Sequence, residues 1–422
     1  MAVSPGMAAA MTIRHALPAV PTVGVEEEFL LVQPCGRLSA RAPEVLGAAG
    51  AGPGEVHQEF RRCQVEAVSA VCSGAGDLLA GLRCLRRRLA DSAARRGLRV
   101  AATATPVLAE PRLPPLSIGR RYARMVREYG PLASRSVTCG CHVHVAIPDR
   151  ETGVLVCNHL RPWLPLLLAL TANSPFGHGA DAGYASLRYV LWGHWPSASP
   201  PPFFPSLDDY EAGVRGLLAS RAALDRKMVY WDVRLSERHP TLEMRVCDVA
   251  PSAEEAVMVA LLTRALVVMA MAQLERGRAA PRLSEHDLRA HMWRASRDGF
   301  EGACLDPSTG RLAPAETVLG RLLAWTRPAL AQAGDLDHVE TVSERLRRGG
   351  SGALRQRLAF ARRGRLPDVV DAVCLPPTVP EQAGRVPAVR SRGSEGGSVE
   401  PTGGRAGRGL LDADALPGEM PR

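Results

Sequence analysis

The segment Val23-Gly-Val-Glu-Glu-Glu-Phe-Leu-Leu-Val32 places three consecutive acids inside a stretch that otherwise predicts a buried β-strand. Side chains alternate faces along a strand, so Glu26 and Glu28 project together while Glu27 points the other way. Two carboxylates on one apolar-flanked face repel each other and are poorly solvated unless a cation lies between them, and Mg²⁺ prefers such oxygen ligands. An edge strand that exposes its acids to water is the alternative, but the flanking Val, Phe and Leu residues weaken it.

Further strands are predicted from β-branched residues at 100–105, 137–147, 228–235 and 241–249. An apolar stripe at helical spacing predicts a helix between 77 and 97 that packs on the sheet, with the stripe made of Leu78, Leu82, Leu85 and Leu89. Ser252 and Glu255 form a capping box at the start of an apolar helix that continues through Glu275, and beyond about residue 280 the pattern is almost wholly helical. We therefore expect an α+β fold in which a sheet from about the first 250 residues is covered by helices and followed by a helical C-terminal portion.

The ends of the chain differ in composition from its body. Residues 1–20 are predicted to be a disordered leader, and residues 377–422, rich in Gly, Pro, Ser, Arg and Glu, a disordered tail. Residues 21–376 contain no repeat and no linker-like stretch. We expect them to form a single domain, sheet-rich over 21–250 and helical over 251–376.

The net charge of +9 does not indicate nucleic-acid binding, because the basic residues are scattered among acids and aromatic residues make up only 5% of the chain. Lys227 is the only lysine, so no Gly-Lys-Ser/Thr phosphate loop is present and Schiff-base chemistry could use no other residue. Any bound nucleotide would therefore be held by arginines, backbone amides or metal.

The ten cysteines include no C-x-x-C pair and are typical of reduced, mostly buried thiols in a cytoplasmic protein. The N-terminus lacks the basic residues and continuous apolar core of a secretory signal. The most apolar segment, 256–274, carries Arg264 in its middle, which favours a buried helix over a membrane span. We expect a cytoplasmic protein without a membrane partner.

The segment Cys139-Gly-Cys-His-Val-His-Val145 has the residue types of a zinc site with two cysteines and two histidines. Strand alternation argues against a single tetrahedral site, because His142 and His144 share one face while Cys139 and Cys141 lie on the other or bend away at the glycine. Two interpretations remain for the histidines: they contact metal or phosphate, or they are a half-buried pair without a ligand.

The segment Thr241-Leu-Glu-Met-Arg-Val-Cys-Asp248 places Glu243 and Arg245 on one face of a predicted strand. These two groups could form a plain ion pair, or they could hold a cation and its phosphate. Glu59 and Glu66, in a stretch of mixed periodicity, add two more acids, for which ordinary surface positions are the alternative.

Together these motifs resemble the bacterial carboxylate-amine ligases, also called type 2 glutamate-cysteine ligases. The resemblance is carried, in order, by G-V-E-E-E-F, Q-E-F with Q-V-E, C-H-V-H-V, N-S-P-F with S-L-R-Y, and L-E-M-R-V-C-D. It runs from about residue 22 to 373 and includes H-M-W-R-A-S-R-D-G, L-D-P-S-T-G and G-A-L-R-Q-R in the helical portion.

The resemblance implies a glutamine-synthetase-like catalytic fold, in which an antiparallel sheet curves around a nucleotide and metal ions. It assigns divalent cations to Glu26, Glu28, Glu59, Glu66, His142 and Glu243. It assigns nucleotide or substrate contacts to His142, His144, Arg188, Arg245 and Arg294, with Arg188 and Arg245 meeting phosphate or the substrate carboxylate.

The implied reaction transfers the γ-phosphoryl group of ATP to a substrate carboxylate, and an amine then attacks the acyl phosphate to give an amide, ADP and phosphate. Mg²⁺, with Mn²⁺ as an alternative, would neutralise charge as the bond breaks. Glutamate and cysteine are the leading substrates by resemblance, and another amine is left open, as is assembly into a homo-oligomer.

Two other functions are compatible with the same residues. A zinc-dependent hydrolase could use the H-x-H pair and the carboxylates to activate water. A non-catalytic nucleotide-binding module is the other alternative, and the full set of acids argues against it.

Overall fold

Seven strands form one sheet around the acid-bearing segment in the computed structural model, which describes residues 18–378. The strand order is β2-β3-β1-β5-β9-β8, β4 also pairs with β1, and every pairing is antiparallel. The strands of this sheet are β1 (Val23–Val32), β2 (Glu55–Gln58), β3 (Gln64–Val68), β4 (Arg99–Ala101), β5 (Gly140–Ala146), β8 (Val233–Leu235) and β9 (Thr241–Asp248). The predicted antiparallel sheet, built from the first 250 residues, is confirmed.

The register of the central strands brings the polar residues of distant motifs to one face. Directly opposed pairs in this sheet are Glu26 with His142, Glu28 with Glu66, and His144 with Glu243. Residues opposite each other on antiparallel strands point to the same side of the sheet. Four motifs, on β1, β3, β5 and β9, therefore meet on one surface although they lie far apart in the chain.

The helices alternate with the strands along the first 250 residues and predominate after them. They are α1 (Ala42–Leu46), α2 (Ala75–Ala94), α3 (Arg120–Tyr129), α4 (Pro131–Ser134), α5 (Arg150–Leu160), α6 (Leu164–Thr171), α7 (Leu187–Trp192), α8 (Leu207–Ala219), α9 (Ala253–Glu275), α10 (Glu285–Asp298), α11 (Ala315–Ala333), α12 (Leu336–Gly349), α13 (Gly352–Ala361) and α14 (Leu366–Val373). Single 3₁₀ turns occur at Arg161–Trp163, Arg226–Met228 and Gly299–Glu301.

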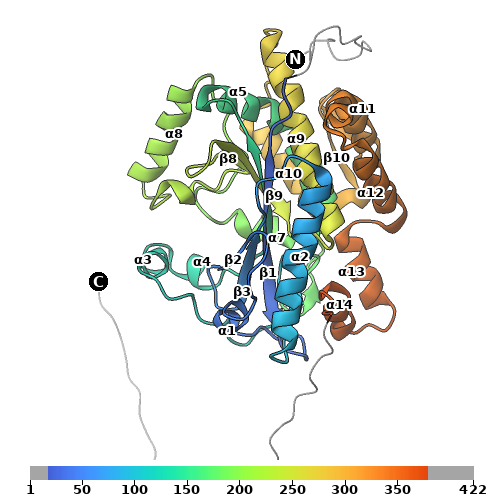
Figure 1. Ribbon diagram of the computed structural model, residues 1–422. Coiled ribbons are helices and arrows are strands. Elements are labelled where there is room, and N and C mark those ends of the chain that lie inside the picture. The colour runs from blue at the N-terminus through green and yellow to red at the C-terminus, as the bar shows by residue number, and fades with distance from the viewer. Residues whose placement is uncertain (1–17, 379–422) are drawn as a thin grey trace, which may run out of the picture. The chain divides into compact units, whose positions relative to one another are not determined.

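Helices α2 and α9 lie along one side of the sheet, with α11 to α14 beyond them, whereas α3, α4 and α8 lie on the other side (Figure 1). The four leucines of the predicted α2 stripe are fully buried, which confirms that this stripe packs on the sheet. Helix α9 is buried on nearly all sides and begins at the predicted capping box, where the Ser252 hydroxyl accepts a hydrogen bond from the Glu255 amide. The apolar core thus fills the side of the sheet opposite the polar motifs.

Two stretches are long and apolar enough, by length and composition alone, to cross a membrane: Arg150–Thr171 and Ala253–Glu275. Of their apolar windows, 94% and 83% respectively are buried inside the fold, as in the core helices of globular proteins. The expectation of a buried helix at 256–274 is confirmed.

Several predicted elements differ in extent from the observed ones. The strand predicted at 228–235 is only Val233–Leu235, because residues 226–228 form a 3₁₀ turn and Trp231 packs into the core beside Ser199. The helical portion also contains a hairpin, β10 (Ala303–Asp306) and β11 (Arg311–Pro314), and a second small hairpin joins β6 (Phe176–Gly177) to β7 (Ala180–Asp181). The predicted leader and tail lie outside the described residues except for their innermost few positions.

Candidate active site

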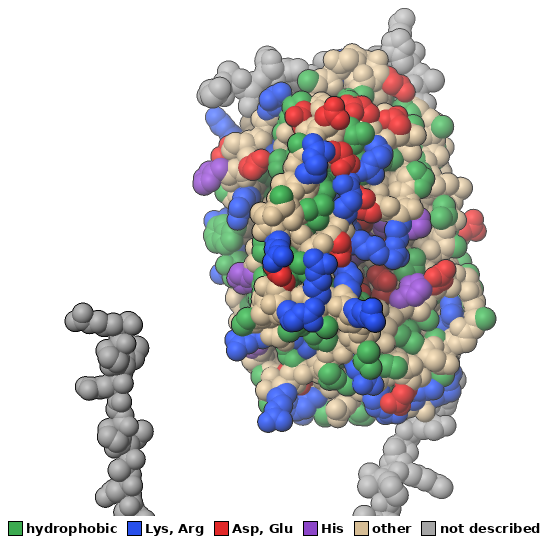
Figure 2. Space-filling model, turned by 90° about the vertical axis from the view of Figure 1, so that its left-hand side faces the viewer, with side chains coloured by type: hydrophobic (Ala, Val, Ile, Leu, Met, Phe, Trp, Pro, Cys, Tyr) green, Lys and Arg blue, Asp and Glu red, His purple; other side chains and the backbone are tan. Residues whose placement is uncertain are grey.

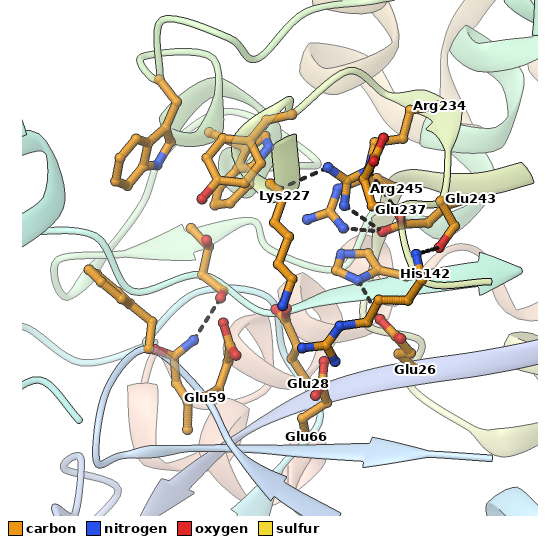
Figure 3. Close-up of a pocket in the computed structure, with 18 of the residues that line it drawn as sticks. Glu26, Glu28, Glu59, Glu66, His142, Lys227, Arg234, Glu237, Glu243 and Arg245 are labelled. Atoms are coloured by element: carbon orange, nitrogen blue, oxygen red, sulfur yellow. Dashed lines mark hydrogen bonds and ion pairs between the residues drawn. The ribbon is translucent and has the colours of Figure 1, made fainter. Parts of the chain in front are cut away.

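A cavity of about 260 Å³ opens on the polar face of the sheet. The acids that line it are Glu26, Glu28, Glu59, Glu66, Glu237 and Glu243. Figure 2 shows the side of the molecule that carries α3 and α8, where arginine side chains gather and acidic side chains appear between them. Figure 3 shows the labelled acids converging on this cavity from β1, β3 and β9 and from the segments that carry Glu59 and Glu237.

Strand alternation in β1 separates the three consecutive acids as predicted. Glu26 and Glu28 line the cavity, whereas Glu27 is fully buried on the opposite side of the sheet, paired with Arg86. The second cavity-facing acid is anchored by the backbone, because the Gly140 amide donates to Glu28 Oε2 at 2.7 Å.

Glu26, His142 and Glu243 form a group of side chains that could hold a metal ion. One ligand atom from each lies within 4.8 Å of the other two. His142 Nδ1 is 3.2 Å from Glu26 Oε2, and His144 Nε2 is 3.4 Å from Glu26 Oε1. Burial opposes ionisation of Glu26, but these two imidazoles hold the pKa of its carboxyl well below the usual range.

The two histidines differ in their surroundings. Burial and the nearby Arg245 guanidinium lower the pKa of His142, so its ring is neutral and keeps a nitrogen lone pair for a ligand. Burial also disfavours the charged form of His144, but contact with Glu26 and Glu243 outweighs it and raises the pKa of that ring. His144 Nδ1 lies 2.9 Å from the Thr241 hydroxyl, which fixes the ring orientation.

Glu28, Glu59 and Glu66 form a second acidic group in the same cavity. Burial and the charge of Glu28 raise the pKa of Glu59 to about 8. Burial and the neighbouring glutamates raise the pKa of Glu66 well above the usual value. Without a cation, these crowded carboxyls therefore retain protons near neutral pH, and a bound cation would displace them.

Two arginines hold Glu243. Arg234 of β8 donates to it through Nε at 2.9 Å and NH2 at 3.2 Å, and Arg245 contacts the same carboxylate. Burial opposes ionisation, but these guanidinium groups keep the pKa of Glu243 well below its ordinary value. The Nε of Arg245 is buried without a hydrogen-bond partner, so this arginine retains a donor for an anionic ligand.

The donor set fits a hard divalent cation. Several carboxylates and two imidazoles face a common space, and Glu28, Glu59 and Glu66 form no ion pair with a described side chain. Carboxylates suit Mg²⁺ and Mn²⁺, and the imidazole nitrogen is compatible with Mn²⁺. The predicted exclusion of a four-residue cysteine and histidine site also agrees with the geometry, because Cys139 and Cys141 are buried and do not line the cavity.

Two arginines predicted to touch the nucleotide or the substrate do not line the cavity. Arg188 is buried, and its guanidinium donates to the carbonyls of Val246 and Arg245 at 3.2 and 3.1 Å. Arg294 lies on the outside of α10, where it pairs with Asp298 at 3.0 Å and stacks on Trp293. Arg188 is instead held by backbone carbonyls and the buried Asp248, 3.8 Å away, and Arg294 by Asp298.

The cavity also has lining residues that sequence patterns did not single out as site residues. Its apolar wall consists of Phe60, Tyr122, Met125, Trp192, Trp195 and Tyr230. Its cations besides Arg245 are Arg121, Lys227, Arg234 and Arg238. A charged residue inside the predicted strand 228–235 was a usable signal for Arg234, whereas the aromatic residues come from loops, α3 and the end of α7 without a shared pattern.

Comparisons with known proteins agree with this geometry. The sequence model of the glutamate-cysteine ligase family 2 matches residues 22–372. A Rhodococcus jostii protein provisionally named glutamate–cysteine ligase 2-1 is 44% identical over 350 residues, covering 83% of this chain and 95% of the relative. A Mycobacterium sp. (strain KMS) protein provisionally named glutamate–cysteine ligase 2-2 is 45% identical over 362 residues, covering 85% and 98%.

Among solved structures, the fold is similar to that of the glutamate–cysteine ligase of Francisella tularensis in complex with AMP. The TM-score is 0.62 at 12% sequence identity, and the match covers 85% of this chain and 89% of the other. At this identity the likeness shows a shared fold, in agreement with the predicted α+β architecture.

Proposed function

The chain belongs to the glutamate-cysteine ligase family 2, and from that premise we propose that it is an ATP-dependent ligase that joins a carboxylate of glutamate to an amine, with cysteine as the first candidate. The observation that carries the proposal is the convergence of Glu26, Glu28, Glu59, Glu66 and Glu243 on one cavity.

In the proposed reaction, a carboxylate oxygen attacks the γ-phosphorus of ATP and the bond to ADP breaks. The amine nitrogen then attacks the carbonyl carbon of the acyl phosphate, and phosphate leaves as the amide forms. A carboxylate oxygen is a poor leaving group at neutral pH, and phosphorylation converts it to a good one.

The acids of the cavity, with His142, would hold Mg²⁺ or Mn²⁺. The cation held by these residues would supply positive charge to offset the negative charge that develops in phosphoryl transfer. Arg245 would contact a phosphoryl oxygen through its unpartnered Nε, and Arg234 would keep Glu243 in place. The aromatic wall would exclude water from the acyl phosphate.

The test uses Glu26→Gln and Glu28→Gln, each measured by ADP release and by mass spectrometry of the amide product. We expect each variant to lose activity by about 100-fold or more, because a neutral amide is a poor ligand for a hard cation. The matched control is Glu55→Gln on β2, whose side chain is 73% exposed and outside the cavity. Wild-type activity in either cavity variant would contradict the proposal.

A panel of amines tested with glutamate would identify the acceptor, and one strong responder would establish it. Chelation followed by separate addition of Mg²⁺, Mn²⁺ or Zn²⁺ distinguishes the ligase from a zinc hydrolase. Restoration by Zn²⁺ without ATP would favour the hydrolase.

A cytoplasmic location is part of the proposal. Its support is the placement of the cysteines, seven of which are buried in the fold among the described residues. Fractionation of cells expressing a tagged chain tests it, and recovery in the secreted fraction would count against it.

A further inference from the structure

Behind the acidic face of the sheet, a buried ion pair joins β1 to α2. Glu27 is 0% exposed and Arg86 is 6% exposed. The Arg86 Nε donates to Glu27 Oε2 at 2.9 Å, and its NH2 donates to Glu27 Oε1. The pair lies on the core side of the sheet and takes no part in lining the cavity.

The same guanidinium also holds the segment that follows β9. Its NH2 donates to the Ala250 carbonyl at 2.8 Å, and its NH1 donates to the Pro251 carbonyl at 3.2 Å. These carbonyls lie directly after β9, the strand that carries Glu243 into the cavity. Arg86 therefore ties β1 to β9 from behind, across the intervening strand β5.

The backbone position of Glu27 determines where the neighbouring cavity acids lie. Its neighbours in sequence are Glu26 and Glu28, the two acids that β1 contributes to the cavity. Its Cα partners are Ala67 of β3 and Cys141 of β5, each one residue from a further cavity residue. A shift of Glu27 would move candidate ligands on three strands together.

Stability alone is a weak reason for such a pair. Removing two charges from water costs about as much as their attraction returns, and apolar replacements of a buried pair are often neutral or stabilising. The four hydrogen bonds of Arg86 have defined directions, which apolar packing cannot reproduce.

We propose that Arg86 and Glu27 are positioning residues, which set the separation between the cavity acids of β1 and those of β9 and thereby the affinity for the divalent cation. The inference rests on the proposed function, because the cation in question is the one that the ligase reaction requires. It concerns the affinity for that cation and not the chemistry of the ligation.

The test replaces the pair by apolar residues of similar size, Glu27→Leu with Arg86→Met. Binding of Mn²⁺ to the full chain is measured by electron paramagnetic resonance, and thermal unfolding is followed by circular dichroism. We expect the affinity for Mn²⁺ to fall by about 10- to 100-fold, the range found when groups that orient metal ligands are removed. The unfolding temperature should stay close to that of the wild type.

A second buried pair of the same design provides the control. Arg264 NH2 contacts Asp335, both side chains are 1% exposed, and Arg264 NH1 also donates to the carbonyls of Ser73 and Pro21. This pair joins α9 to the start of α12, away from the cavity. Arg264→Met with Asp335→Leu should leave the affinity for Mn²⁺ unchanged.

Unchanged affinity in the Glu27 and Arg86 variant, or an equal loss in the control variant, would overturn the proposal. If the apolar variant does not fold, Arg86→Lys takes its place, because a lysine cannot make the same four hydrogen bonds. Weaker binding of Mn²⁺ by Arg86→Lys would support the proposal and wild-type binding would overturn it. A wild type that binds Mn²⁺ but forms no amide would refute the proposed function and leave this comparison valid.

Discussion

Gly140 lies between the cavity acid Glu28 and the buried guanidinium of Arg188. Its amide donates to Glu28, and a Cβ at this position would lie 2.5 Å from NH2 of Arg188. That guanidinium is held by two backbone carbonyls and cannot move freely. We expect Gly140→Ala to lower the free energy of unfolding by about 1–3 kcal/mol through overpacking, and to reduce ligase activity by displacing the amide from Glu28. Urea denaturation and ADP release measure the two effects.

Gly76→Ala in α2 is the matched control, because a Cβ there would meet nothing within 4 Å. In a helix this change should stabilise by up to about 1 kcal/mol. If Gly140→Ala behaved like Gly76→Ala, close packing against Arg188 would not be the reason for a glycine at position 140.

Asp232 gives a pH dependence that can be isolated by one substitution. Burial raises the pKa of its carboxyl to about 7, although the Tyr189 hydroxyl at 2.9 Å and Arg188 favour its charged form. The unfolded chain releases this proton near pH 4, so the native state binds the extra proton between about pH 4 and pH 7. The contribution of Asp232 to stability is therefore complete below about pH 4 and lost as the pH rises through 7.

Asp232→Asn keeps the uncharged form at every pH and removes this loss. Relative to the wild type, we expect the variant to gain on the order of 4 kcal/mol in unfolding free energy between pH 4 and pH 8. Urea denaturation of both proteins at a series of pH values measures the difference. A constant difference across the series would show that Asp232 is ionised throughout.

At this scale, strand alternation was sufficient to place Glu26 and Glu28 in the cavity and Glu27 behind it. It could not supply the partner of Glu27, because Arg86 is brought there only by the docking of α2. Arg188 shows the same limit, since its carbonyl partners belong to a strand about 57 residues further along the chain.

The capping box of α9 acts on more than one element. The Ser252 hydroxyl donates to the Glu255 carboxylate at 2.9 Å, and Arg355 of α13 contacts the same carboxylate at 3.0 and 2.6 Å. We expect Ser252→Ala to cost about 1 kcal/mol as a lost N-cap. Glu255→Ala should cost more, because it also releases α13. Chemical denaturation of the two variants tests this order, and equal costs would show that the contact with Arg355 contributes nothing.

Helices and strands were predicted correctly where a local sequence pattern defines them. They were missed where their formation depends on pairing with another strand. The bounds of β1 and the start of α9 follow from β-branched residues and a cap. The strands β2 and β3 were not predicted, because each is only four or five residues long and β2 is a largely exposed edge strand. The four-residue strands of the β10–β11 hairpin are too short to show a period.

For the whole molecule, the order of the motifs along the sequence indicated which of them share a site. The antiparallel strand register explains how their side chains come together. The aromatic wall was beyond reach, because Phe60, Tyr122 and Tyr230 lie in separate segments that approach only after α3 folds over the sheet. A site assembled from loops leaves no periodic trace in sequence, whereas one assembled from strands does.

The acidic cavity also implies a conflict between stability and function in the whole molecule. Glu28 and Glu66 face each other directly across β1 and β3, and like charges in this arrangement destabilise a sheet. Without added metal, Glu66→Gln should therefore raise the free energy of unfolding by about 1 kcal/mol. With excess Mg²⁺ and ATP, the wild type should become more stable than the variant. Ligands at about 100 times their Kd stabilise the wild type by about 2.7 kcal/mol, and they stabilise the variant by less because it binds them more weakly. Thermal unfolding with and without Mg²⁺ and ATP measures both differences, with Glu55→Gln as the exposed control. A variant less stable than the wild type in the absence of metal would show that Glu66 is a structural residue, and that its repulsion from Glu28 is already compensated within the fold.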